Sequence, residues 1–370
     1  MSCFRELCFR FAAPTVAVLA LVVGSGDTVA VGINDYQLTR SFALPAPGTF
    51  SGGNVLFDAL PDGRLLALNG PAVSVESAPK SGTFTALGTI PGFAPTFGPS
   101  FLAISPDGAH AAAGSNGGGA VVVFDTGNPT SATSHAMQDF SGEWFDNRYL
   151  AVANFTTGST VQVLDTNAPS VTTVINNIGG FSAGISFDAA GNLYTGNATD
   201  TAAGGSSTGW VKAFSAASWQ NALTTSTPLN FETSGSPIVD LLTAYPIGFD
   251  NSGNMFAGGG DFYGGSGDYG YAALVDAAAI ASALASPQSS PPIAPASSTA
   301  VLRKFASPPA TIDSSLPPSW AYNAATGELY LNYVYGNGTV DVYSAVPEPA
   351  GILLLVIGGL ALVASRGRRS

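Results

Sequence analysis

The stretch "VLFDALPDGRLLALNG" at residues 55–70 contains two apolar runs joined by a short turn that ends at Gly63. Asp and Gly in such a turn are typical of a β-hairpin, because Asp accepts backbone N–H bonds and glycine takes the positive φ that the turn requires. The stretch therefore predicts two short antiparallel strands.

The same pattern recurs along the chain at a regular distance. The related segments are "FLAISPDGAHAAAGS" (101–115), "GEWFDNRYLAVANF" (142–155), "AGISFDAAGNLYTGN" (183–197), "YPIGFDNSGNMFAGG" (245–259) and "WAYNAATGELYLNYV" (320–334). Aligned on the turn glycine, which is replaced by Asn147 in one repeat, the first three intervals are 45, 39 and 44 residues. A period of this length is typical of a β-propeller blade.

Each hairpin is followed by another alternating segment that predicts a third strand. These segments are "AVSVESA" (72–78), "AVVVFDT" (120–126), "TVQVLDT" (160–166), "WVKAFSA" (210–216), "YAALVDA" (271–277) and "TVDVYSA" (339–345). A more variable fourth strand is expected, at 82–90 in the first blade and 170–178 in the third. The chain is therefore predicted to be an all-β, six-bladed β-propeller over residues 31–345. The alternative is a seven-bladed ring with a degenerate blade within 195–325.

Two insertions explain why the later repeats are farther apart. The segments 214–223 and 275–284 are Ala-rich and predict short helices, with Ser215 and Asp276 as N-caps. The last blade has no room for a fourth strand before residue 346, whereas residues 34–44 precede the first repeat without a blade of their own. We predict that this N-terminal strand completes the last blade and closes the ring. The body resembles six-bladed propellers of the NHL and YVTN-like kind.

The N-terminus has the order of residues found in a secretory signal peptide. Arg5 and Arg10 form a basic region, and the apolar core at 11–23 is followed by small residues. The signal is predicted to cover residues 1–26, and the alternative cleavage site follows residue 30. Both cysteines of the chain lie within it, so the mature protein is expected to have neither disulfides nor thiolate metal sites.

The C-terminus, residues 346–370, combines a Pro-Glu-Pro motif, an apolar run and a basic end. As a helix, the uncharged run 350–364 would span roughly 22 Å, which is short of a bilayer core of about 30 Å. This predicts a transmembrane segment suited to a transient stay, with its basic end on the cytoplasmic side. The basic residues are Arg366, Arg368 and Arg369.

The tail resembles the PEP-CTERM sorting signal of Gram-negative bacteria through Pro347, Glu348 and Pro349, the apolar run and the basic end. The resemblance implies processing by exosortase, transient anchoring in the inner membrane, and export to the cell envelope or the extracellular matrix. It also implies a bacterium that makes exopolysaccharide or biofilm.

The residue inventory argues against nucleic-acid binding and against familiar catalysts. The net charge of −12 repels polyanions. The chain has two histidines: His110 is expected on a second strand and His135 in an exposed Ser/Thr-rich segment. There is no nucleophile elbow, HExxH motif or phosphate loop. We therefore expect a protein that is not an enzyme.

Several acidic residues are candidates for metal binding. The loop 258–271 is Gly-rich with Asp261 and Asp268, and oxygen ligands on such a loop would suit Ca²⁺. The runner-up function is a metal-dependent hydrolase of the propeller lactonase kind. Its candidate ligands are Glu143, Asn147, Asp188 and Asp250, although Asp residues in the repeated turns are expected to be structural.

The leading hypothesis is an exported propeller that binds exopolysaccharide or a surface protein without catalysis. A purely structural coat or scaffold component is the third hypothesis. The first and third hypotheses both include sorting by exosortase.

Overall fold

The computed structural model describes twelve segments of the chain. They are residues 36–44, 55–95, 98–115, 119–154, 159–179, 181–198, 209–241, 245–259, 271–293, 301–304, 318–333 and 339–345. The predicted signal peptide and the predicted sorting tail both lie outside these residues. In the part that is described, neither helix has the length and apolarity needed to cross a membrane.

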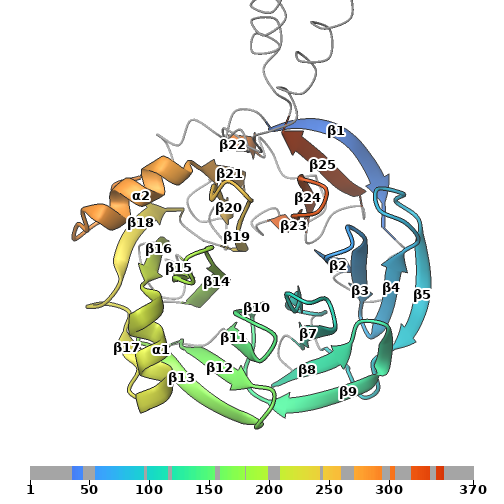
Figure 1. The fold of residues 1–370 in the computed structure, drawn as a ribbon, viewed down its shortest axis with the longest axis horizontal. Helices are drawn as coiled ribbons and strands as arrows, with labels where there is room; N and C mark the ends of the chain where they lie inside the picture. Colours follow the sequence, from blue (N-terminus) through green and yellow to red (C-terminus); the bar gives the residue numbers. More distant parts are fainter. Residues whose placement is uncertain are drawn as a thin grey trace, which may run out of the picture. The chain divides into compact units, whose positions relative to one another are not determined.

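Six antiparallel sheets stand around a central axis as the blades of a propeller (Figure 1). The innermost strands of blades one to six are β2 (Val55–Ala59), β6 (Leu102–Ile104), β10 (Ser141–Trp144), β14 (Phe181–Phe187), β19 (Ile247–Phe249) and β23 (Pro318–Asn323). The second strands are β3 (Leu65–Asn69), β7 (His110–Gly114), β11 (Tyr149–Ala153), β15 (Leu193–Ala198), β20 (Met255–Gly259) and β24 (Glu328–Tyr333). The six-bladed prediction is confirmed, and the seven-bladed alternative is wrong.

The outer half of each blade also follows the predicted order. The third strands are β4 (Ala72–Glu76), β8 (Ala120–Asp125), β12 (Val161–Asp165), β16 (Trp210–Phe214), β21 (Tyr271–Val275) and β25 (Thr339–Ala345). The fourth strands of blades one to five are β5 (Phe84–Thr89), β9 (Asn128–Ala136), β13 (Ser170–Asn176), β18 (Ser236–Asp240) and β22 (Val301–Lys304). The fourth strands predicted at 82–90 and 170–178 are therefore present.

The outer strand of blade six comes from the other end of the chain. Strand β1 (Tyr36–Ala43) pairs antiparallel with β25, from Tyr36 opposite Ala345 to Ala43 opposite Thr339. This confirms the predicted closure by the N-terminal strand. With β24 on one edge and β1 on the other, β25 has no unpaired edge to which another chain could add a strand.

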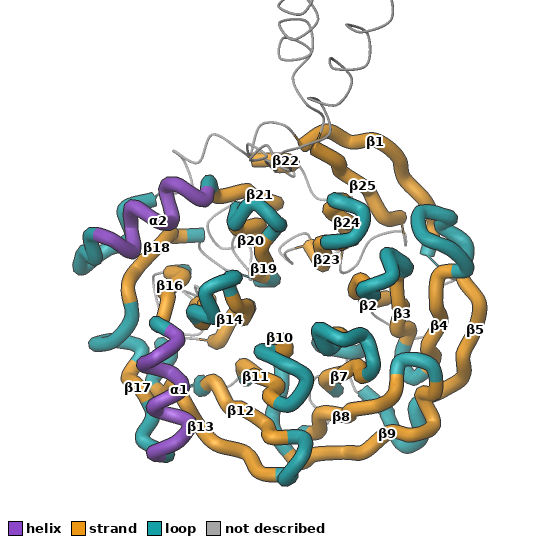
Figure 2. Tube along the Cα trace, viewed as in Figure 1, coloured by secondary structure: helices purple, strands orange, loops and turns teal. Residues whose placement is uncertain are grey.

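The two predicted helices are present and lie at the rim of the ring (Figure 2). Helix α1 (Ala216–Thr225) begins at Ser215, whose side chain accepts the Ser218 N–H, and α2 (Ala277–Ala285) begins at Asp276. After α1 the chain forms β17 (Leu229–Asn230), which pairs parallel with β13 of the preceding blade. The sequence did not suggest this fifth strand of blade three, because two residues are too few to form a pattern.

Acidic side chains in the repeated turns bond to the turn backbone. The Asp62, Asp107 and Asp188 carboxylates accept the N–H groups of residues two positions ahead, at 3.0, 2.9 and 2.9 Å. The predicted structural role of these turn residues is therefore confirmed.

The apolar core is divided among the spaces between neighbouring blades. One cluster joins blades one and two through Leu66, Leu68 and Val122, and another joins blades three and four around Val163 and Trp219. Because each space is filled by side chains from two sheets, the blades stabilise one another. A ring missing one blade would leave two of these apolar faces in water.

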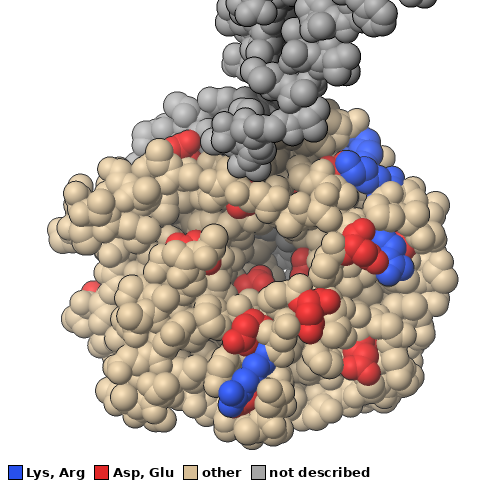
Figure 3. Space-filling model, in the orientation of Figure 1, with Lys and Arg blue, Asp and Glu red and all other residues tan. Residues whose placement is uncertain are grey.

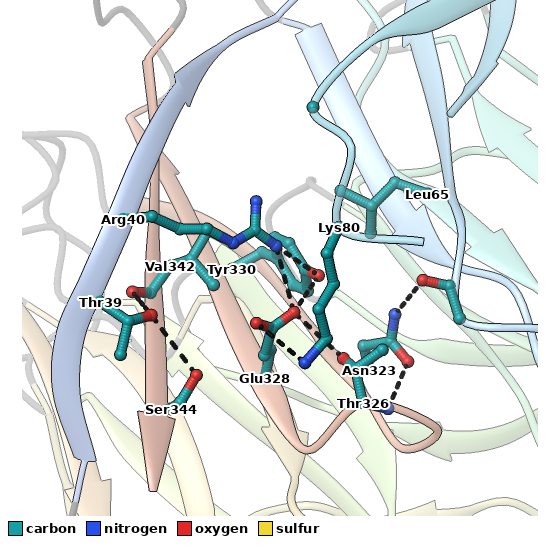
Figure 4. A network of polar contacts seen from close by, with 12 residues as sticks. Thr39, Arg40, Leu65, Lys80, Asn323, Thr326, Glu328, Tyr330, Val342 and Ser344 are labelled. Carbon is teal, nitrogen blue, oxygen red and sulfur yellow. Dashed lines mark hydrogen bonds and ion pairs between the residues drawn. The ribbon is translucent and has the colours of Figure 1, made fainter. Parts of the chain in front are cut away.

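A buried carboxylate connects the closing strand to the first blade (Figure 4). Glu328 on β24 accepts hydrogen bonds from the Tyr330 hydroxyl at 2.5 Å and from Arg40 of β1 at 3.1 Å. Its other oxygen lies 3.3 Å from the ammonium of Lys80, in the loop after β4. Burial alone would raise the pKa of Glu328, but the bond from Tyr330 and the charges of Arg40 and Lys80 outweigh it and lower the pKa.

We predict that Glu328→Gln destabilises the propeller by about 2 kcal/mol at pH 7, because two cations lose their shared anion. A lowered pKa in the folded state stabilises above the ordinary carboxyl pKa of about 4.3, and this contribution disappears as the pH falls through the lowered value. Urea unfolding should therefore show different stabilities for the two proteins at pH 7 and equal stabilities in strong acid. The control is Glu232→Gln at an exposed turn residue. Equal stability of wild type and Glu328→Gln at pH 7 would contradict this role.

Candidate functional site: the central channel

The inner strands enclose a cavity of about 670 Å³ at the centre of the ring. It is lined by residues of all six innermost strands and by the turns that follow three of them, at 60–61, 105–106 and 324–325. Figure 3 shows a hollow at the centre of the ring, with acidic side chains at its edge. The cavity falls within the 300–1,000 Å³ range of typical small-molecule sites.

Two carboxyl groups lie on one side of this cavity. Asp58 on β2 stands opposite Leu66 in its hairpin, and Glu143 on β10 stands opposite Ala151. In both blades the acidic residue is one position before the last pair of the hairpin ladder. Equivalent positions on the inner strands of blades one and three point to the same side of their sheets, and both carboxyls line the channel.

The Asp58 carboxylate is held by backbone N–H groups of two blades. One oxygen accepts the Ala59 N–H at 2.7 Å, and the other accepts the Ile104 N–H of blade two at 2.8 Å. Burial raises the pKa of Asp58 to about 6, against the lowering effect of these two hydrogen bonds. Asp58 therefore carries a negative charge at neutral pH and also joins blades one and two.

Glu143 is less well stabilised as an anion. One of its oxygens accepts the N–H of the next residue, Trp144, at 3.2 Å. Burial and the neighbouring charge of Asp58 raise the pKa of Glu143 to about 8. At neutral pH the pair therefore consists of an ionised Asp58 and a mostly protonated Glu143, which can donate a hydrogen bond.

Aromatic rings line the other side of the cavity. Phe187, Phe249 and Tyr322 come from the inner strands of blades four, five and six, and each is partly accessible. The Phe249 ring packs against Tyr194 at 4.8 Å between centroids, and Phe187 packs against Trp219 at 5.4 Å. These contacts with the core hold the rings in place, so the aromatic wall is formed in advance of any ligand.

Tyr245 crosses the ring at one end of the cavity. It precedes the inner strand of blade five, and its hydroxyl donates a 2.7 Å hydrogen bond to the Ser100 carbonyl, next to blade two. Blades two and five face each other across a six-bladed ring (Figure 1). The Tyr245 ring also packs on Phe140 at 4.7 Å, so this side chain forms a floor under part of the channel.

Glycine makes room for another ring in the wall. A Cβ atom at Gly142 would come within 2.4 Å of the Phe101 ring, so a larger residue there would displace the ring. The third repeat therefore requires glycine beside Glu143 if the Phe101 ring is to keep its place.

The two histidines lie away from the cavity. His110 on β7 is half-exposed, with its Nδ1 3.2 Å from the Asp125 carboxylate. His135 is partly buried on the outer strand β9, and this burial lowers its pKa. The prediction of an exposed His135 is thus only partly right.

Of the four residues proposed as lactonase ligands, Glu143 alone lines the cavity as described. Asp188 and Asp250 bond to the N–H groups of their own turns, and Asn147 accepts the Asp107 N–H of the neighbouring blade at 3.0 Å. These three belong to turns because their repeat position places them beyond the inner strand. Asp188 and Asp250 therefore have the structural role that was expected of acidic residues in the repeated turns.

The described segments contain no group of three or more His, Cys, Asp or Glu side chains that could hold a metal ion. Asp261 and Asp268, the candidate Ca²⁺ ligands, lie outside those segments, as do the motif 347–349 and the basic residues 366–369. Sequence reasoning missed Asp58, although one signal was present. A charged residue inside the apolar strand "VLFDA" is unusual enough to indicate a channel-facing position.

Comparison with solved structures identifies the fold as a β-propeller. The PQQ-bound aldose sugar dehydrogenase of Streptomyces coelicolor has a TM-score of 0.53 at 13% identity, over 84% of this chain and 97% of that one. The PQQ domain of Coprinopsis cinerea pyranose dehydrogenase has a TM-score of 0.52 at 11% identity, also over 84% and 97%. Hydrazine synthase of Kuenenia stuttgartiensis has a TM-score of 0.50 at 13% identity, over 78% and 76%.

No family model matches the chain, and neither does any curated protein. At these identities the structural likeness establishes the fold alone.

We predict that Glu143→Gln changes how stability depends on pH. A carboxyl group whose pKa is raised by folding stabilises the protein at a pH below its ordinary pKa of about 4.3. That contribution to the free energy of unfolding disappears as the pH rises through about 8. Glutamine cannot become charged beside Asp58. The free energy of unfolding of the variant, relative to that of the wild type, should therefore increase by at least about 1 kcal/mol from pH 5 to pH 9. Urea unfolding at several pH values measures this. If the stabilities of the two proteins depended on pH in the same way, the raised pKa of Glu143 would be contradicted.

Proposed function

We propose that this chain is an exported β-propeller that binds a carbohydrate in its central channel without transforming it. The observation that carries the proposal is a 670 Å³ cavity with carboxyl groups on one side and partly accessible aromatic rings on the other.

The two walls suit the two kinds of surface that a sugar presents. Hydroxyl groups around a sugar ring donate to carboxylates such as Asp58 and accept from a protonated carboxyl such as Glu143. The C–H groups on the face of the ring can pack against Phe249 or Tyr322. A cavity of this volume takes a short oligosaccharide or the end of a longer chain.

The serines of the described cavity wall are not paired with a histidine. Ser105, Ser141 and Ser186 line the cavity, whereas His110 is on the second strand of blade two, His135 is on its outermost strand, and neither lines the cavity. A serine without a base remains a weak nucleophile at neutral pH. The metal-dependent hydrolase has no candidate ligand set in the described segments.

The cofactor named in two structural neighbours does not fit this channel. PQQ is a quinone with three carboxylic acid groups, which need cationic partners. No Lys, Arg or His is found among the described residues of the cavity wall, and two carboxyl groups already lie there. We therefore propose no redox role through this cofactor.

We further propose that the protein is delivered to the cell envelope or the extracellular matrix. It is supported by the N-terminal signal pattern and by the resemblance of residues 346–370 to exosortase-processed tails. In this view the protein contributes to an exopolysaccharide or biofilm matrix.

Intact-mass measurement tests the sorting step. Protein from wild-type cells should lack Arg366, Arg368 and Arg369, whereas protein from cells without exosortase should keep them. A mature protein that still ends at Ser370 in wild-type cells would contradict the sorting proposal.

Glycan-array binding by the purified protein tests the channel. Phe249→Leu keeps an apolar side chain but removes the flat ring, so it should weaken binding at least tenfold. The matched control is Val171→Ala, at an exposed site on the outer strand of blade three. Binding that Phe249→Leu leaves unchanged would place the carbohydrate outside the channel, and no binding at all would refute the carbohydrate function.

A further inference from the structure

We propose that the carbohydrate bound in the channel carries a positive charge, as an amino sugar with a free ammonium group does. This inference rests on the proposed carbohydrate function and names the class of sugar. It is carried by the charge and aromatic character of the cavity wall.

The described wall contributes negative charge and no positive charge. Asp58 and Glu143 are its acidic residues, and the other described lining residues are apolar, aromatic, serine or glycine. A cavity that encloses an anion without a counter-ion attracts a cationic ligand and repels an anionic one.

The basic side chains that the structure describes are all engaged elsewhere. Arg40 and Lys80 bind Glu328 at the ring closure, Arg64 binds Asp62, and Arg148 binds Asp165 at 2.6 Å. Lys212 donates to the Phe231 carbonyl at 2.7 Å, between blades three and four. None of these residues lines the cavity, so none of them neutralises Asp58 by direct contact.

The aromatic wall favours an organic cation in particular. An ammonium group is attracted to the face of an aromatic ring, most strongly where water is excluded. Phe187, Phe249 and Tyr322 provide such faces within the cavity that holds the two carboxyls. An amino sugar has a ring to pack on an aromatic side chain and an ammonium group to pair with Asp58.

A bare metal ion fits this wall less well than an ammonium. Ca²⁺ takes six to eight oxygen ligands, and Asp58 and Glu143 are the only carboxyl groups among the described lining residues. An ammonium needs fewer partners, and it can approach an oxygen that keeps its existing bond because a carboxylate has several lone pairs.

Calorimetry with three tetrasaccharides of the same length tests the inference. The probes are the β-1,4 tetramer of glucosamine, its fully N-acetylated form and cellotetraose. The glucosamine tetramer should bind at least tenfold more tightly than the other two, because N-acetylation removes the charge and cellotetraose lacks the nitrogen. Its affinity should fall as salt is added, whereas the affinities of the neutral sugars should not.

Three variants localise the effect. Asp58→Asn removes the charge of the channel, so it should weaken glucosamine-tetramer binding at least tenfold and abolish the preference for this tetramer over cellotetraose. Phe249→Leu should weaken the binding of both sugars. The control Glu232→Gln removes one negative charge from an exposed turn and should change the binding of neither sugar. Circular dichroism and the urea midpoint establish that each variant is folded.

The outcomes separate this inference from the function on which it rests. Equal, salt-independent binding of all three tetramers would overturn the charged-ligand inference and leave carbohydrate binding in place. Binding of no tetramer would overturn both. Weakening by Glu232→Gln as large as that by Asp58→Asn would mean that the overall charge of the protein, and not the channel, attracts the amine, and would also overturn the inference.

Discussion

Strand β1 pairs with β25 along seven residue pairs, so the first and last parts of the propeller are held in one sheet. Backbone hydrogen bonds supply the pairing, and the Arg40–Glu328–Lys80 contacts tie that sheet to blade one. Closure determines where the inner strands stand. Without it, blades one and six would separate, and the cavity that depends on all six inner strands would open on one side.

The channel also depends on bonds that cross from blade to blade. Asp58 accepts the Ile104 N–H, the Trp144 indole donates to the Ala103 carbonyl at 3.1 Å, and Tyr245 spans the ring to Ser100. Asp58 therefore has two roles, because the carboxylate that charges the channel also fixes the spacing of two blades. The site and the scaffold share residues, and a change at Asp58 would affect both.

Much of the fold could be predicted from local sequence patterns. The repeated turns gave the number of blades. Five of the six hairpins have a glycine with positive φ at the same place, namely Gly63, Gly108, Gly191, Gly253 and Gly327, and the hairpin of blade three has Asn147 there. Ser215 and Asp276 marked the helix starts because capping depends on neighbouring residues alone. Closure followed from counting strands at the two ends of the chain.

The site was less accessible to sequence reasoning, because it depends on contacts between distant blades. Asp58 and Glu143 are separated by 85 positions in the sequence, and their interaction arises only when blades one and three face the same axis. The aromatic wall comes from three other blades, and its residues resemble ordinary strand residues in the sequence. Acidic residues in the turns were candidate metal ligands, but their position in the repeat directs their side chains to the backbone of the turn.

Hydrogen exchange with and without the glucosamine tetramer tests most directly whether the central channel is the binding site. The account predicts that bound sugar slows exchange of the amides beside the two carboxyls, at Ile104 and Trp144, and along the inner strand β19. Amides on the outer strands β5, β9 and β13 should be unaffected. Protection confined to the outer strands, with none at the inner strands, would contradict the central claim that the closed ring forms a ligand channel.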